Sequence, residues 1–183
     1  MSEGCTAKSS LDPELEKDVA RWNALPLAQF EYQQPPQGWH FVESDIVHIR
    51  FSLPCEPEFK REINEDLWAF HYWCTIGKRY YSLYAFPTND VRVPEFRDAF
   101  FRSHIDGVIR GLEKRGAPGI FKPVCRVSYQ GAIGRQSILN VATTQFEMRI
   151  LPGSNAMISM QVIDLTSNQP GDSARYFNSL NLL

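Results

Sequence analysis

The sequence lacks the short motifs that carry most metal and nucleophile chemistry. Its four cysteines never lie closer than nineteen positions apart, and no C-x-x-C pair occurs. Its four histidines include no pair at i, i+2 or i, i+4, which argues against a zinc site on one helix face. Neither G-x-S-x-G nor S-x-x-K is present. We therefore expect no metal, no cofactor, no catalytic residue and no enzymatic activity.

Histidine, glycine and acidic residues outside these motifs have ordinary structural interpretations. His48 and His71 fall in strand patterns and could meet across a sheet, but a hydrogen-bonded or exposed strand histidine is the commoner role. The segment 131–135 holds two glycines but opens no helix, so it is interpreted as a turn and not as a phosphate-binding loop. The acidic segment 56–66 lacks the spacing and the turning glycine of a calcium loop and is interpreted as a solvated loop.

Cysteine usage and the absence of long apolar runs bear on localisation. We interpret Cys74 and Cys125 as small apolar residues of buried strands, because a chain of 183 residues builds a core without disulfide staples. This usage favours a reducing compartment, so a cytoplasmic localisation is expected. The first eight residues have no apolar h-region of a leader, and no run reaches the roughly 18 apolar residues of a membrane span.

Charge is small in total but unevenly distributed. The net charge of −2 gives no general attraction to nucleic acid or to acidic membranes. Residues 1–90 carry 8 Lys/Arg and 14 Asp/Glu, net −6, whereas residues 91–183 carry 11 and 7, net +4. Two interpretations stay open: solvated faces that attract each other within one fold, or a bipolar surface that docks a partner.

The element pattern predicts an α+β fold. A helix is expected over 11–25, with Asp12 as N-cap and Pro13 in its first turn, and a longer one over 94–115, where Arg102, Asp106 and Arg110 form an i, i+4 chain of opposite charges. Strands are expected near 47–52, 67–76, 79–86, 124–129, 136–141, 145–151 and 157–163, with a last short helix capped by Asp172. This order favours an antiparallel sheet of about six strands sandwiched by helices. Residues 1–38 are expected to be a tail and a helix, and 39–183 the sandwich domain.

Aromatic residues are dense in the hairpin 67–86, and they supply the candidate binding surface. Packing in the core and on the sheet explains most of them, but a pocket or a partner groove is the alternative. The candidate residues are Trp68, Trp73, Tyr81, Tyr84, Arg102 and Arg110.

Several segments, taken in order, resemble the PsbP-like (Mog/PsbP) αβα-sandwich superfamily. The strand that runs into F-x-x-P-x-x-P is matched by 51–57, the glycine-turn aromatic strand by 77–86, and the G-x-x-G strand connection by 131–136; the closing helix resembles 176–182. The match covers about 40–183 and departs from the family pattern at Cys55 and Glu56, where a glycine and a lysine are common. The family has no shared catalytic residues.

The resemblance implies a protein that binds larger partners. Our first functional hypothesis is a non-enzymatic adaptor or assembly factor that docks another protein, not nucleic acid, through a charged face and an aromatic patch. The alternative is a small-molecule binding module with a pocket lined by Trp68, Trp73, Tyr81 and Tyr84. A hydrolase is the third hypothesis, for which no nucleophile–base pair can be named from the sequence.

Overall fold

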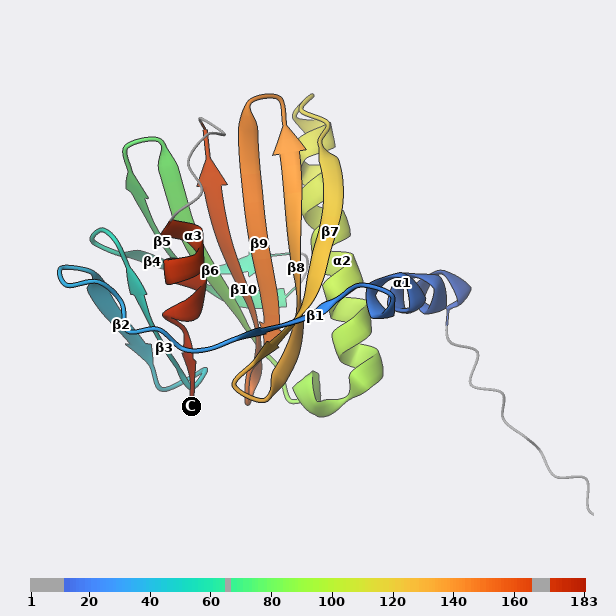
Figure 1. Ribbon diagram of the computed structural model, residues 1–183, viewed down its shortest axis with the longest axis horizontal. Helices are drawn as coiled ribbons and strands as arrows, with labels where there is room; N and C mark the ends of the chain where they lie inside the picture. Colours follow the sequence, from blue (N-terminus) through green and yellow to red (C-terminus); the bar gives the residue numbers. More distant parts are fainter. Residues whose placement is uncertain (1–11, 65–66, 166–171) are drawn as a thin grey trace, which may run out of the picture.

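The computed structural model describes residues 12–64, 67–165 and 172–183, which form a large twisted sheet with a further layer on each face (Figure 1). The large sheet has eight strands in the order β1-β7-β8-β9-β10-β6-β5-β4. Its neighbours are antiparallel, except that β1 runs parallel to β7. The strands are β1 (Leu27–Phe30), β4 (Glu58–Asn64), β5 (Leu67–Ile76), β6 (Arg79–Pro87), β7 (Ile120–Tyr129), β8 (Ala132–Val141), β9 (Thr144–Pro152) and β10 (Ala156–Asp164).

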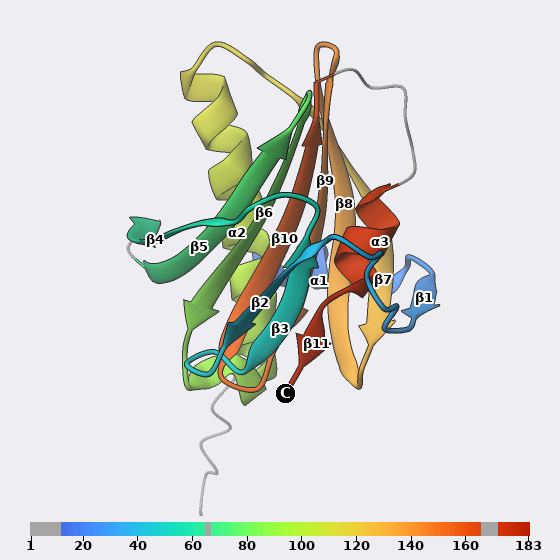
Figure 2. The same ribbon diagram turned by 90° about the vertical axis from the view of Figure 1, so that its left-hand side faces the viewer.

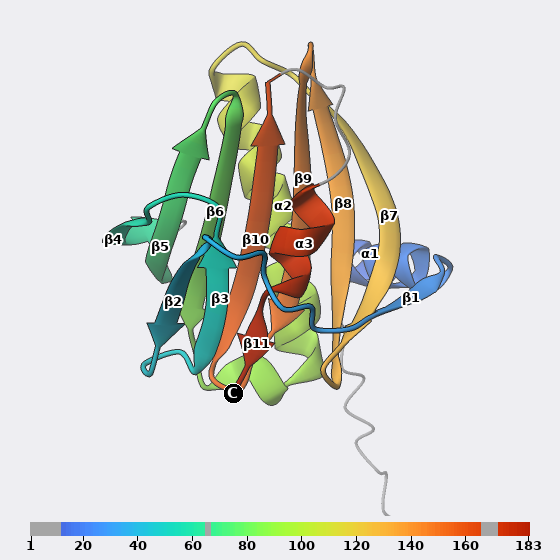
Figure 3. The ribbon, with the colours of Figure 1, turned by 60° about the vertical axis from the view of Figure 1, so that its left-hand side comes forward.

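Different elements cover the two faces of this sheet. On one face lie α3 (Asp172–Asn178) and a small sheet in the order β11-β3-β2, formed by β2 (His40–Ser44), β3 (Ile49–Leu53) and β11 (Asn181–Leu182). The long helix α2 (Pro94–Lys114) follows a 3-10 turn, η1 (Asp90–Arg92), and crosses the opposite face, with α1 (Pro13–Asn23) beside it. Figures 2 and 3 show α2 behind the large sheet, and the small sheet and α3 in front of it.

Strand β6 shows why both faces need a cover. Tyr81, Leu83 and Ala85 belong to the core between the large sheet and the small sheet, whereas Phe86 belongs to the core beneath α2. Successive side chains of a strand point to opposite faces, so apolar residues at both parities place β6 between two layers. Strand β6 is therefore a central strand that is covered on both faces.

The predicted sheet of about six antiparallel strands sandwiched by helices is wrong. The large sheet is mixed and has eight strands, and a second sheet, not a helix layer alone, covers one of its faces. The additional strands formed where the sequence shows weak apolar alternation. The clearest case is β4, which lies within the acidic segment interpreted as a solvated loop and pairs with β5 along all seven of its residues.

Several local predictions are confirmed. The side chain of Asp12 caps α1 by accepting a hydrogen bond from the Glu14 backbone N–H at 3.0 Å. The predicted hairpin joins β5 to β6 through Gly77, whose φ of +59° suits glycine. The long helix begins at Pro94 as predicted and ends one residue before the predicted boundary. The turn at Gly131 also forms, and its positive φ permits the tight β7–β8 hairpin.

Cys74 and Cys125 are both buried in strands as predicted, but the expectation that the chain has no disulfide is wrong. Cys74 lies in β5 and forms a disulfide with Cys55, their Cα atoms 5.8 Å apart. Cys55 lies in the bend that follows β3, and the packing of the small sheet on the large one brings this bend against β5. Cys125 is a buried free thiol.

The segment 12–38 contributes to the same cores as the rest of the chain. Trp22 of α1 is buried against the α2 layer, and β1 pairs in register with β7. Further along, the backbone N–H of Gln33 donates to the carbonyl of Asn178 at 2.8 Å. None of the helices that the structure describes is long and apolar enough to cross a membrane.

Candidate functional site

The aromatic candidate residues all lie on β5 and β6, but not on one surface. By strand alternation, Trp68 and Tyr81 are on the face of the small sheet, and Trp73 and Tyr84 are on the face of α2. Tyr81 is a core residue in edge-to-face contact with Tyr176, with ring centroids 5.4 Å apart. The structure therefore does not bring these four residues into a single pocket.

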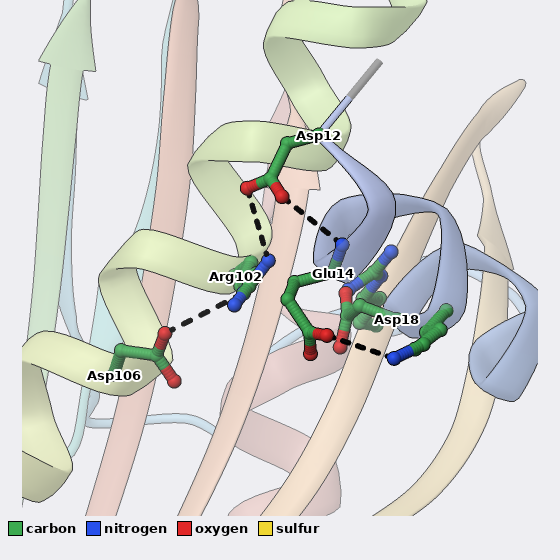
Figure 4. A network of polar contacts seen from close by, with 7 residues as sticks. Asp12, Glu14, Asp18, Arg102 and Asp106 are labelled. Carbon is green, nitrogen blue, oxygen red and sulfur yellow. Dashed lines mark hydrogen bonds and ion pairs between the residues drawn. The ribbon is translucent and has the colours of Figure 1, made fainter. Parts of the chain in front are cut away.

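Arg102 joins the two helices. Its guanidinium lies 3.5 Å from Asp12 Oδ2 and 3.7 Å from Asp106 Oδ2, and Figure 4 shows it between the two carboxylates. Because Asp12 also caps α1, this contact fixes the start of α1 against the middle of α2. Arg110 is exposed. Arg102 thus acts in helix packing, separately from the aromatic residues of β5 and β6.

A chain of polar contacts crosses β4, β5 and β6 on the face of α2. Glu62 Oε1 lies 3.1 Å from His71 Nδ1, and His71 Nε2 lies 3.0 Å from the hydroxyl of Tyr80. Burial lowers the pKa of His71 to about 4 despite the opposing pull of the Glu62 carboxylate, so the ring is neutral at pH 7. A carboxylate only accepts, so Nδ1–H donates to Glu62 and Nε2 accepts from Tyr80.

This carboxylate–histidine–hydroxyl order has the form of a proton relay, but its hydroxyl is a weak acid. Burial raises the pKa of Tyr80 to about 12. The His71 ring is also fixed by stacking on Tyr84, with centroids 3.9 Å apart, and by Trp73 at 4.5 Å. The arrangement orients His71, and burial keeps its ring uncharged at pH 7, which supports a structural role over acid–base catalysis at neutral pH.

A serine–histidine pair lies deeper under α2. His104 Nε2 is 2.9 Å from Ser159 Oγ, and burial lowers the pKa of His104 to about 4. A nucleophile needs access to a substrate, but His104 is 4% exposed and Ser159 is 0% exposed. The sequence signal for this pair is a single histidine, His104, within the apolar stripe of a helix, which a pattern of paired histidines does not include.

The floor beneath α2 carries further polar groups whose hydrogen bonds are incomplete. Ser82 Oγ is buried and has no hydrogen-bond partner in the described part of the chain. Its neighbour across the β6–β10 pairing is Gln161, which is 8% exposed and donates one long hydrogen bond, 3.5 Å, to Ser159 Oγ. Gln161 and Tyr84 line a cavity of about 210 Å³ beside α2.

The outer edge of β4 carries the second candidate feature. This strand is last in the large sheet, and its outer edge has no strand partner among residues 12–64, 67–165 and 172–183. Three large apolar side chains of β4 and β5 are exposed here. Their exposed fractions are 51% for Phe59 and 62% for Ile63 on β4, and 59% for Trp68 on β5. The guanidinium carbon of Arg61 lies 5.6 Å from the Trp68 ring centre, a cation–π distance.

Neither a metal centre nor a known family adds to these features. No group of three or more His, Cys, Asp or Glu side chains within the described residues is placed to hold a metal ion. No protein-family model and no curated protein matches this sequence. The two local features, the open β4 edge and the cavity beside α2, therefore carry the functional argument.

Proposed function

We propose that this protein is a non-enzymatic adaptor or assembly factor that docks an extended segment of another protein along the outer edge of β4. The observation that carries the proposal is the position of β4 at the end of the large sheet, beside the exposed side chains of Phe59, Ile63 and Trp68. The resemblance to PsbP-like proteins, whose members bind larger partners, points to the same class of function and stays a prediction.

The chemistry of an unpaired strand defines how such a partner binds. The outer N–H and C=O groups of β4 offer backbone hydrogen bonds to an added strand, which is the mode called β-augmentation. Side chains of the added strand alternate between the two faces of the sheet. Those on the face of the small sheet meet Phe59, Arg61 and Ile63, so this edge selects for apolar residues at alternate positions.

The charges on the two faces of β4 act differently on a pairing with a second copy of this chain. On the face of α2, such a pairing sets Lys60 of each strand opposite Glu62 of the other, which is favourable, whereas Arg61 on the other face meets its own copy. Arg61 lies at the centre of β4, and an antiparallel two-fold pairing of two such strands about this residue places the two guanidinium groups directly opposite each other. Like charges in that position are destabilising. A partner strand with a carboxylate opposite Arg61 forms a favourable cross-strand pair instead.

Selection from a random peptide library on the full chain tests the proposal. We expect selected peptides to alternate apolar residues with an acidic residue, and to protect the backbone amides of β4 from hydrogen exchange. Ile63→Lys should weaken binding of a selected peptide by about 2 kcal/mol or more, the loss typical of a central interface residue. The matched control is Ile120→Lys, because Ile120 is 76% exposed and lies on β7, six strands away from β4.

Three results would overturn this assignment. Peptides that bind the Ile63 and Ile120 variants equally well do not use the β4 edge. Protection confined to other strands places the contact elsewhere. If the protein forms a concentration-dependent dimer and Ile63→Lys dissociates it, the occupant of the β4 edge is a second copy of this chain and not another protein.

A further inference from the structure

The cavity beside α2 is built from the helix and from three strands of the large sheet. Its walls carry one formal positive charge and no carboxylate. The lining residues are Tyr84, His104, Gly107, Val108, Gly111, Leu112, Arg115, Phe146 and Gln161. Its volume of about 210 Å³ is below the roughly 300–1,000 Å³ of pockets for drug-sized ligands, so any occupant is smaller.

Two glycines keep the helix wall of this cavity open. Gly107 and Gly111 are one turn apart on α2, and a Cβ added at Gly111 would meet no atom within 4 Å. Glycine inside a helix is less favourable than alanine by about 1 kcal/mol, so the helix carries a cost in free energy at each position. The space at Gly111 is therefore not filled by the packing of this chain.

Gln161 adds a hydrogen-bond acceptor to the wall of the cavity. It is more than nine-tenths buried, it lines the cavity, and the long bond from its Nε2 to Ser159 is the one hydrogen bond that its side chain forms within the described residues. Its carbonyl oxygen thus remains free to accept. This oxygen is not one of the fully buried side-chain atoms that lack a partner in the described part of the chain, so it is accessible to a donor that enters the cavity.

The remaining lining residues fix the charge and the shape of the occupant. Arg115, at the C-terminal end of α2, forms no ion pair with the residues that the structure describes, so it is available to a carboxylate. His104 stays neutral at pH 7 and adds no second charge. Tyr84 and Phe146 supply aromatic walls, and Leu112 an aliphatic one, which suits a planar ring.

The geometry points to a ligand site for a small aromatic carboxylate that carries a hydroxyl group. Its carboxylate pairs with Arg115, its ring lies against Tyr84, Phe146 and Leu112, and its hydroxyl donates to Gln161. This site is separate from the β4 edge, so the two proposals fail independently. Of the four residues predicted to line a small-molecule pocket, Tyr84 alone lines this cavity.

Three related probes separate the contributions of the carboxylate and the hydroxyl group to binding. The full chain is titrated with 4-hydroxybenzoate, with benzoate, which lacks the hydroxyl, and with 4-hydroxybenzyl alcohol, which lacks the charge; binding is followed by backbone amide shifts. We expect 4-hydroxybenzoate to bind most tightly and to shift the amides of Gly107, Gly111 and Arg115. Arg115→Gln should weaken its binding about tenfold and leave the neutral alcohol unchanged.

A second variant, Gly111→Leu, tests where the probes bind, and Arg110→Gln is the matched control for Arg115→Gln. Gly111→Leu fills open space, so it should abolish binding of all three probes while thermal unfolding shows the fold intact. Arg110→Gln, an exposed arginine of the same helix that does not line the cavity, should change nothing. The proposal is overturned if no probe binds at millimolar concentration, if Arg115→Gln and Arg110→Gln behave alike, or if folded Gly111→Leu binds as the parent does.

Discussion

His104 Nε2 and Ser159 Oγ are 2.9 Å apart, and this hydrogen bond links the middle of α2 to the centre of β10. His71 is a second histidine held in the interior, between Glu62 and Tyr80. Burial lowers the pKa of both rings from the usual 6.5 to about 4. Both histidines are therefore neutral in the folded protein over a range of pH in which the unfolded chain protonates them.

This difference makes stability depend on pH, and the sign follows from proton uptake. Well above pH 6.5 neither state binds a proton at these rings, and the stability is complete. As pH falls through 6.5 toward 4, the unfolded state binds protons first and stability is lost. Each histidine should remove about 2 kcal/mol from the free energy of unfolding between about pH 7 and pH 5. Urea unfolding at a series of pH values measures this loss.

Single variants show how much of the loss of stability at low pH each histidine causes. His104→Gln and His71→Gln should each reduce the pH dependence by about half, whatever their effect on stability at pH 7. His48→Gln is the control, because His48 is exposed in the turn before β3. An unchanged slope in the His104 variant would show that its ring is protonated alike in the folded and unfolded states.

Two glycines should respond to alanine in opposite directions. A Cβ at Gly134 of β8 would lie 2.1 Å from the backbone carbonyl oxygen of Ile150, and a strand of the large sheet cannot move away without breaking its pairing. Gly134→Ala should therefore destabilise the protein by about 2–4 kcal/mol, as overpacking does in a close-packed core. Gly111→Ala meets no atom and should stabilise α2 by up to about 1 kcal/mol. Equal effects in chemical denaturation would contradict the close approach at Gly134.

The contrast between predicted and observed elements has a physical cause. The hairpin around Gly77 and the helix from Pro94 were predictable because their turn, cap and apolar spacing are local signals. The segments that became β4 and β1 have weak local signals, and they form strands because β5 and β7 offer them backbone partners. Backbone pairing between distant segments is a tertiary effect that the sequence pattern does not display.

The candidate site was predictable in part for the same reason. The aromatic density of the segment 67–86 predicts a binding surface there, and of its four candidate residues Tyr84 lines the cavity. The strand period also implied that Trp68 and Trp73 point to opposite faces, but not which layer each would meet. Gln161 and Arg115 carry no local signal, because what distinguishes them is the hydrogen bond or ion pair that they do not form.

Arg149 is a buried cation held by neutral groups. Its guanidinium donates to Gln136 Oε1 at 3.0 and 3.1 Å and to Asn178 Oδ1 at 2.8 Å, and it lies over the ring of Phe30 at 4.2 Å. Burial lowers its pKa to about 10, so the charge persists at pH 7. This side chain ties α3 to β8 and β9.

Lysine cannot replace these contacts, although it keeps the charge. An ammonium group lacks the planar fork that reaches both acceptors and stacks on an aromatic ring. Arg149→Lys should lower the free energy of unfolding by about 2 kcal/mol, because an acceptor buried without a donor costs about 1–3 kcal/mol. Arg110→Lys on the exposed face of α2 should stay within about 0.5 kcal/mol of the parent. A neutral result for Arg149→Lys would mean that water satisfies Gln136 and Asn178.

The disulfide between Cys55 and Cys74 should make stability depend on redox conditions. It closes a loop with a sequence separation of 19 and ties the end of β3 to the core strand β5. In the chain-entropy account, a loop of this size contributes about 3 kcal/mol. For a chain of this length that corresponds to a fall of about 6–12 °C in Tm on reduction.

The double variant Cys55→Ala/Cys74→Ala should melt at the lower temperature with or without dithiothreitol. Cys125→Ala should still show the fall in Tm on reduction, because Cys125 is a free thiol. Alkylation followed by mass spectrometry counts the free thiols and verifies that dithiothreitol has reduced the disulfide. If the Tm of the parent protein is the same before and after this reduction, the disulfide does not contribute to stability.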